Sequence, residues 1–226
     1  LEKCSGQDKD KIRDWFKGRQ TDSIVTDYME EYIRSLIPDS TGKFNELEEF
    51  AKEKGVPIAQ KETIKFLEFM VSMKKPIRIL ELGTAIGYSA IKMYKAAGTS
   101  PHITTVERSE EMIKLAKENI KSFNLESKIE IKEGDCLEIL ESLDEPYDLI
   151  FMDAGKGHYN HFLPHCLRLL KEDGIIIADN VLFRGMVASD ELVKRMRKYL
   201  ELVSEDENLI TSVIPMGDGI AVTKRR

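Results

Sequence analysis

The sequence contains few cysteines and no long apolar run. Only three of its 226 residues are cysteine. An odd number of widely spaced cysteines argues against a disulfide framework and a structural zinc site, and favours reduced thiols in the cytoplasm. No apolar stretch approaches the roughly 20 residues that a transmembrane helix needs. We therefore expect a cytoplasmic protein without a membrane span.

An excess of positive charge is also missing. The chain has 34 basic and 40 acidic residues, which gives a net charge of −6. This balance argues against binding nucleic acid through bulk charge, although local basic patches remain compatible with it. Two stretches could form such patches: Lys9, Lys11, Arg13, Lys17 and Arg19 near the start, and Lys224, Arg225 and Arg226 at the end.

The first residues contain no apolar leader segment, so we expect no signal peptide. They also lack an initiator Met. We treat residues 1–21, which can include non-native residues, as an N-terminal segment. A single domain is expected over residues 22–226, because 42% of the residues are hydrophobic and can supply one sizeable core.

The order of the predicted elements indicates an α/β fold. Helical periodicity at 8–20, 22–37, 44–54 and 60–73 precedes any strand, which suggests a helical cap. Strands and helices then alternate, as in a parallel sheet built from βαβ units. Asp218-Gly219 lies between two final apolar runs and predicts a hairpin, so the sheet should end antiparallel. The seven expected strands are 77–82, 102–107, 128–132, 147–152, 174–178, 209–214 and 220–223.

The loop after the first predicted strand has the character of a ligand site. Ala85 and Tyr88 stand where the dinucleotide fingerprint requires glycine, which argues against a bound NAD or FAD. Gly83 still permits a tight turn, and backbone amides with the Ser89 hydroxyl could hold a carboxylate at the start of a helix. An ordinary strand–helix turn is the alternative interpretation.

Two further strand ends extend this site. Glu107 ends the second strand, where a carboxylate can accept hydrogen bonds from both ribose hydroxyls. Asp135 follows the third strand and could flank an adenine. A ribose acid and a carboxylate cradle without a pyrophosphate loop together indicate S-adenosylmethionine.

The fourth and fifth strands end in a second group of polar residues. Asp153, Asp179 and Asn180 should meet at one sheet edge and form an all-oxygen set suited to Mg²⁺, or less selectively to Mn²⁺ or Ca²⁺. Lys156 lies three residues after Asp153. Beside a divalent cation its charged form is disfavoured, so it could act as a general base. The alternatives are aspartates that cap helices and a lysine on the surface.

Other catalytic patterns are weaker. The spacing of His158, His161 and His165 could gather zinc, but Pro164 interrupts the start of that helix and no further ligand completes the site. The chain contains no G-x-S-x-G motif, so an esterase triad is unsupported.

Taken together, these motifs resemble the cation-dependent class I O-methyltransferases, the family of catechol and caffeoyl-CoA O-methyltransferases. The resemblance rests on residues 80–89, on Asp153-x-x-Lys156, on residues 179–185 and on Gly217-Asp218-Gly219. Within this family the chain is most similar to the bacterial tRNA 5-hydroxyuridine methyltransferases, through Val56-Pro57-Ile58, Gly83 to Ser89, Asp179 to Gly185 and the basic tail. The family has a Rossmann-like, seven-stranded, mostly parallel sheet with an antiparallel last strand and an N-terminal helical cap.

The resemblance also implies roles for the site. It assigns the metal to Asp153, Asp179 and Asn180 and the base to Lys156. The residues expected to line the S-adenosylmethionine site are Ala59, Gly83, Ser89, Glu107, Asp135 and Asp153.

The implied acceptor is 5-hydroxyuridine in tRNA, or alternatively a small catechol or a caffeoyl-CoA-like phenol. A homodimer is also implied, formed through the apolar N-terminal helices. A non-catalytic S-adenosylmethionine-binding protein and an NAD oxidoreductase are the rival classes.

Overall fold

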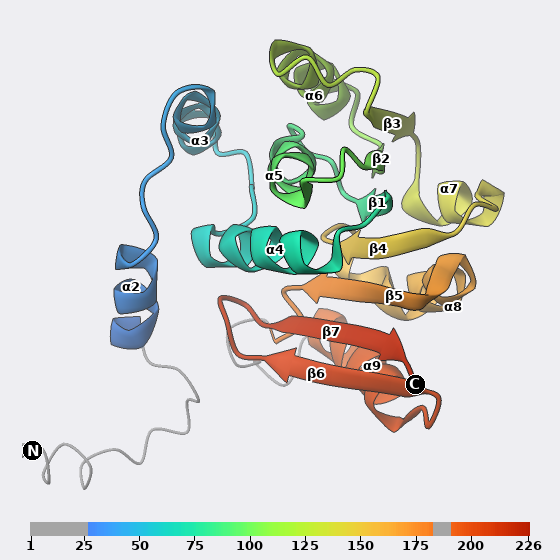
Figure 1. The fold of residues 1–226 in the computed structure, drawn as a ribbon. Helices are drawn as coiled ribbons and strands as arrows, with labels where there is room; N and C mark the ends of the chain where they lie inside the picture. Colours follow the sequence, from blue (N-terminus) through green and yellow to red (C-terminus); the bar gives the residue numbers. More distant parts are fainter. Residues whose placement is uncertain (1–26, 183–190) are drawn as a thin grey trace, which may run out of the picture.

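The computed structural model describes residues 27–182 and 191–226, whose centre is a seven-stranded sheet (Figure 1). Its order is β3-β2-β1-β4-β5-β7-β6. Strands β1 to β5 are parallel, whereas β7 pairs antiparallel with both β5 and β6. The expected mostly parallel sheet is thus confirmed. The strands are β1 Arg78–Leu82, β2 His102–Glu107, β3 Ile129–Glu133, β4 Tyr147–Met152, β5 Leu170–Asp179, β6 Leu209–Ile214 and β7 Ile220–Arg225.

Helices cover both faces of this sheet, as Figure 1 shows. One apolar cluster joins α3, α4, α5 and α6 to Ile79 and Phe151, and the other joins α7, α8 and α9 to Leu80 and Met152. Because both faces are buried, the central strands are almost continuously apolar. The helices are α2 Asp27–Ser35, α3 Lys43–Lys54, α4 Lys61–Lys74, α5 Tyr88–Ala97, α6 Glu110–Ser122, α7 Cys136–Ser142, α8 Tyr159–Leu169 and α9 Glu191–Glu205, with the 3₁₀ turn η1 at Lys156–His158.

No helix of the described residues is long and apolar enough to cross a membrane. Helix α2 agrees with the end of the expected helix 22–37. The expected helix 8–20, its basic residues and the proposed boundary after residue 21 lie outside the described residues. Residues 183–185, the end of one family motif, lie outside them as well.

Two details of the prediction are wrong. Pro164 does not interrupt helix α8, because it lies in the second turn and removes only one hydrogen bond, to Asn160 near the helix start. Strand β5 begins at Leu170 rather than at 174, with an irregular register between the pairs at Tyr147 and Leu149 of β4. Gly174 and the charged residues before it interrupt the apolar run, so the sequence pattern does not indicate this early pairing.

The sheet order reverses between β1 and β4, since the chain continues from β1 to β2 on one side and from β4 to β5 on the other. In open α/β sheets, ligands bind outside the carboxyl ends of the strands at this point. The topology therefore places a candidate site where β1, β2, β4 and β5 end.

Candidate functional site

The register of the sheet brings the predicted metal ligands together. Met152 of β4 pairs with Ala178 of β5, so the next residue of each strand, Asp153 and Asp179, emerges at the same edge. The amide of Asp153 donates to the Leu82 carbonyl at 2.9 Å, which ties the end of β4 to β1. The two carboxylates are thus held by three neighbouring strands.

The two carboxylates share a poorly solvated environment. Asp179 is 2% exposed, and burial together with the charge of Asp153 raises the pKa of Asp179 to about 7. Burial likewise raises the pKa of Asp153, while Lys156 acts in the opposite direction. Two neighbouring carboxylates, one buried and one partly buried, repel each other, so a bound cation would stabilise their ionised forms.

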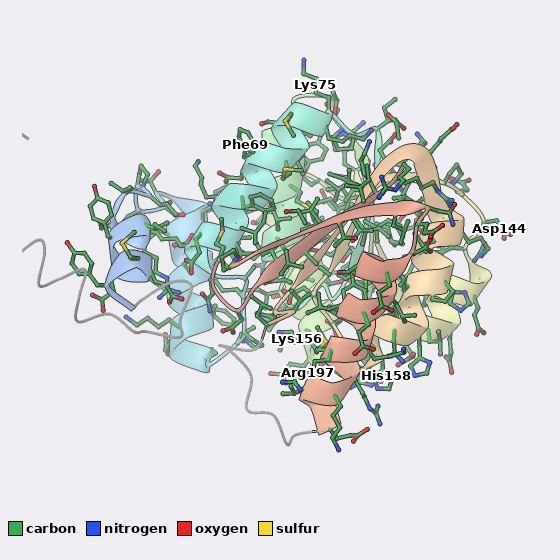
Figure 2. All side chains as sticks on the ribbon, turned by 90° about the horizontal axis from the view of Figure 1, so that it is seen from below. Phe69, Lys75, Asp144, Lys156, His158 and Arg197 are labelled. Atoms are coloured by element: carbon green, nitrogen blue, oxygen red, sulfur yellow. The ribbon has the colours of Figure 1, made fainter. Side chains whose placement is uncertain are left out.

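Lys156 approaches this pair from η1. Its Nζ lies 3.7 Å from Oδ1 of Asp153, and its side chain is 33% exposed. Gly155 precedes the turn at φ 59°, a left-handed conformation that suits glycine. Arg195 of α9 packs against the same turn, its Cδ 3.6 Å from a Cβ built on Gly157. In Figure 2, Lys156 is labelled at the same end of the molecule as His158 and Arg197.

Asn180 completes the predicted set in an unusual backbone conformation. It is 9% exposed and has a φ of 60°, which asparagine tolerates better than most residues. Its backbone amide donates to Oδ1 of Asp179 at 2.8 Å. Its side-chain Nδ2 lies 3.5 Å from Oδ2 of Asp218, a residue of the predicted hairpin turn and of the Gly217-Asp218-Gly219 motif, for which the sequence predicted no role in the site.

The predicted cofactor loop lies directly beside these ligands. Gly83 has a φ of 103°, and a Cβ at this position would lie 2.8 Å from Cβ of Ala154. Only glycine therefore allows the loop after β1 to approach the loop after β4 so closely. Gly87, also left-handed, turns the chain into α5.

Glu107, the last residue of β2, holds the same loop by accepting hydrogen bonds from backbone amides. Its Oε2 accepts a hydrogen bond from the amide of Ala85, and its Oε1 accepts from the amides of Arg108 and Ser109, each at 2.9 Å. Each carboxylate oxygen can accept two hydrogen bonds. The ribose role of Glu107 stays a prediction, and the geometry leaves acceptor capacity on Oε2 for it.

Ser89 occupies its expected place but already has a partner. Its hydroxyl donates to Oε1 of Glu81 at 2.5 Å, and Thr105 donates to Oε2 at 2.6 Å. Glu81 is fully buried, and burial raises its pKa to about 8 against these two hydrogen bonds. The sequence signal for Glu81, which the prediction missed, was a single carboxylate inside the apolar strand Ile79–Leu82.

The two remaining cofactor candidates have structural contacts of their own. Asp135 caps α7 by accepting from the amide of Leu137 at 2.9 Å, which agrees with a structural role. Ala59 is partly buried in the segment before α4, where it packs on the α5 side of the core. Binding of S-adenosylmethionine by either residue stays a prediction.

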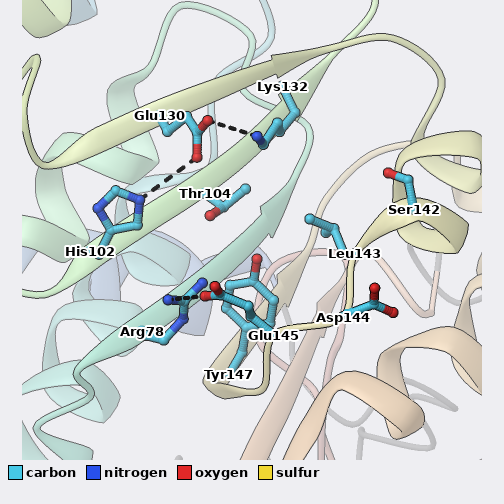
Figure 3. A pocket seen from close by; sticks show the side chains of 10 residues that line it. All are labelled: Arg78, His102, Thr104, Glu130, Lys132, Ser142, Leu143, Asp144, Glu145 and Tyr147. Carbon is cyan, nitrogen blue, oxygen red and sulfur yellow. Dashed lines mark ion pairs between the residues drawn. The ribbon is translucent and has the colours of Figure 1, made fainter.

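A hollow of about 510 Å³ lies at the opposite end of the sheet (Figure 3). It is lined by Arg78, His102 and Tyr147, the first residues of β1, β2 and β4. Arg78 is paired there with Glu145, and His102 lies 3.8 Å from Glu130. Because the predicted ligands lie at the carboxyl ends, this hollow is separate from the candidate site.

Among the described residues, no group of three or more His, Cys, Asp or Glu side chains is arranged to hold a metal. The predicted set has only two such members, Asp153 and Asp179, since its third donor is an amide. Carboxylate and amide oxygens are the donors that Mg²⁺ and Mn²⁺ prefer, so the chemistry of the set fits a hard divalent cation.

A mostly parallel sheet with this strand order is the fold of Rossmann-like α/β methyltransferases. The family described as O-methyltransferase matches residues 39–226, and the chain belongs to this family. The prediction of an O-methyltransferase enzyme is thereby confirmed.

Individual relatives agree with this assignment. The chain is 31% identical to a catechol O-methyltransferase of Niastella koreensis over 160 residues, covering 67% of this chain and 72% of the relative. A Staphylococcus aureus structure with a provisional caffeoyl-CoA O-methyltransferase name has a TM-score of 0.80 at 33% identity, covering 88% of this chain and all of that one. The structure of Podospora anserina methyltransferase PaMTH1, bound to SAH, has a TM-score of 0.81 at 25% identity, covering 90% and 99%. The narrower similarity to tRNA 5-hydroxyuridine enzymes stays a prediction.

Proposed function

We propose that the protein transfers the methyl group of S-adenosylmethionine to one of two adjacent acceptor oxygens, with the help of a divalent cation. The observation that carries this proposal is the convergence of Asp153, Asp179 and Asn180 at one sheet edge, with Lys156 3.7 Å from Asp153. A protein that only bound the cofactor would need no such combination of acids and base.

Asp153, Asp179 and Asn180 would hold the cation, with Mg²⁺ as the first choice. Bound there, the cation would fix two neighbouring acceptor oxygens and favour the ionised form of the acceptor hydroxyl. Two of the three residues are shielded from solvent, since Asp179 is 2% and Asn180 9% exposed.

The chain's own residues supply proton acceptance and alignment. Lys156 would accept the proton of the acceptor hydroxyl at its neutral Nζ, the form that a divalent cation bound beside it would favour. The loop from Gly83 to Ser89, with Glu107 behind it, holds the methyl donor beside the acceptor. Because the sulfonium methyl is already activated, alignment with an ionised oxygen is the main requirement.

The acceptor is proposed as a molecule with two vicinal oxygens. A catechol or caffeoyl-like phenol provides such a pair, and the names of two relatives favour it. In tRNA, 5-hydroxyuridine provides the same pair through its 5-hydroxyl and O4.

The basic tail gives no support to the tRNA alternative. Strand β7 is antiparallel to β5, so Ile220 lies opposite Asp179 while Lys224 lies opposite Ile175, farther from the site. Arg225 donates to the carbonyl of Leu167 at 2.5 Å. Lys224, Arg225 and Arg226 thus lie toward the amino end of β5.

Methyl-transfer assays with labelled S-adenosylmethionine and Mg²⁺ test the acceptor, using catechol, caffeoyl-CoA and tRNA that carries 5-hydroxyuridine. Transfer to at least one of them is expected, with the label on oxygen. Formation of 5-methoxyuridine would select the tRNA alternative, and methylated phenol alone would select the small acceptor. Transfer to none of the three would contradict a two-oxygen acceptor.

We also propose a cytoplasmic homodimer. Cys136 and Cys166 are free thiols among the described residues, as a reducing compartment would keep them. Helices α2 and α4 carry exposed Tyr28, Tyr32 and Phe69, which a second copy of the chain could cover.

A further inference from the structure

The turn between β6 and β7 holds the backbone that follows β5. The amide of Val181 donates to the carbonyl of Gly219 at 3.0 Å, and the amide of Leu182 donates to the carbonyl of Asp218 at 2.8 Å. A Cβ on Gly219 would lie 2.4 Å from Cγ of Leu182, so only glycine permits this approach. The turn is therefore fitted to the segment that begins with Asn180.

On its other side, the turn lies against the start of α4. A Cβ on Gly217 would lie 3.1 Å from Oε1 of Gln60 and 3.5 Å from Oε1 of Glu62. Arg34 of α2 donates to both of these side chains, at 2.7 Å to Gln60 and 2.6 Å to Glu62. Asp218 is thus carried by a turn enclosed between α4 and the end of β5.

In this turn, Asp218 lies close to the side-chain amide of Asn180. Oδ2 of Asp218 lies 3.5 Å from Nδ2 of Asn180. An ionised carboxylate only accepts hydrogen bonds, so it selects the NH₂ end of the amide and turns the oxygen end away. An amide without such a partner could present either end to a cation.

We propose that Asp218 is a positioning residue that orients Asn180 so that its Oδ1 serves as the third metal ligand. This inference rests on the proposed function, because it takes the cation to lie at Asp153, Asp179 and Asn180. Outer partners of this kind orient metal ligands, and their loss typically weakens metal affinity by about 10- to 100-fold.

Two substitutions separate orientation from charge. Asp218→Ala removes both the acceptor and the negative charge, whereas Asp218→Asn removes the charge but keeps an acceptor oxygen. Mn²⁺ affinity is measured by calorimetry without S-adenosylmethionine or acceptor. We expect Asp218→Ala to lose about 10-fold or more and Asp218→Asn to lose clearly less. Equal losses would mean that only the charge of Asp218 matters, and would overturn the proposal.

A second background separates orientation from turn stability. In Asn180→Asp the ligand is a carboxylate, which needs no orienting partner and is repelled by Asp218. We expect Asp218→Ala to leave Mn²⁺ affinity unchanged or raise it in this background, a reversal that a double-mutant cycle records. A loss of the same size in both backgrounds would indicate a merely structural role for the turn and contradict the proposal.

Asp206→Ala is the matched control, because Asp206 accepts from the amide of Asn208 in the turn before β6, at the other end of the same hairpin. Its Mn²⁺ affinity should equal that of the wild type. If Asp179→Ala abolishes Mn²⁺ binding while Asp218→Ala leaves it intact, the positioning role of Asp218 is contradicted but the proposed metal site is not. If the wild type binds no Mn²⁺, both the proposed function and the positioning role of Asp218 are contradicted.

Discussion

In the proposed mechanism, proton transfer depends on Lys156, whose Nζ lies 3.7 Å from Oδ1 of Asp153. Lys156→Arg keeps a positive charge near Asp153, but the guanidinium does not give up its proton at any ordinary pH. We therefore expect kcat to fall about 10²- to 10⁴-fold in this variant, the usual contribution of a general base. Affinity for S-adenosylmethionine, measured by calorimetry, should stay unchanged. Lys117→Ala, on the exposed side of α6, is the control, and an arginine variant with full kcat would rule out Lys156 as the base.

Glu81 predicts a pH dependence of stability. Burial raises its pKa from 4.5 to about 8, so across this window the folded chain keeps a proton that the unfolded chain releases. Stability therefore falls as the pH rises from 4.5 to about 8. In Glu81→Gln this loss disappears, so the variant gains stability relative to the wild type on going from pH 5 to pH 9, by on the order of a few kcal/mol. Urea unfolding at both pH values measures the difference, with exposed Glu118→Gln as the control. Parallel behaviour of Glu81→Gln and wild type would show that Glu81 titrates normally.

At the scale of elements, the loop between β1 and α5 depends on its close contact with the loop after β4. In Gly83→Ala the new methyl group would lie 2.8 Å from Cβ of Ala154 at a φ of 103°. Gly98→Ala is the matched control, since Gly98 has a φ of 66° and no atom within 4 Å of the built Cβ. Both variants carry backbone strain of about 1 kcal/mol, and the crowded site adds about 1–3 kcal/mol.

Thermal unfolding should therefore show a lower Tm for Gly83→Ala than for Gly98→Ala. Only Gly83→Ala should weaken S-adenosylmethionine binding. Equal effects of the two substitutions on Tm and on binding would contradict the close packing of the two loops.

The elements also show what a sequence can and cannot reveal. Asp153 and Asp179 were predictable, because buried parallel strands are continuous apolar runs and their carboxyl ends share an edge. The contact between Asn180 and Asp218 was not, since it depends on the register of an antiparallel pair that is far apart in the chain. The hydrogen bond from Ser89 to Glu81 also escaped prediction, because it depends on side-chain direction across one strand and one helix.

At the scale of the whole molecule, α2 and α4 leave large apolar side chains uncovered. Tyr28 is 66%, Tyr32 53% and Phe69 61% exposed. Figure 2 places Phe69 and Lys75 along α4, away from Lys156. Contact between copies at this surface would therefore leave the site open to its acceptor.

Light scattering at micromolar concentration should give the mass of a dimer for the wild type. Phe69→Glu should shift the mass toward that of a monomer, because a charge buried in an apolar interface is unfavourable. Lys75→Glu, at the end of the same helix, is the control. A monomeric wild type would contradict the homodimer without affecting the assignment of the site.

The most direct test of the central claim is methyl transfer by metal-free protein. After treatment with a chelator, we expect transfer from S-adenosylmethionine to the acceptor to be lost and to return on addition of Mg²⁺ or Mn²⁺. Asp179→Ala should stay inactive under both conditions while still binding S-adenosylmethionine. Full turnover in chelator, by wild-type protein shown by elemental analysis to hold no metal, would contradict cation-dependent transfer at Asp153, Asp179 and Asn180.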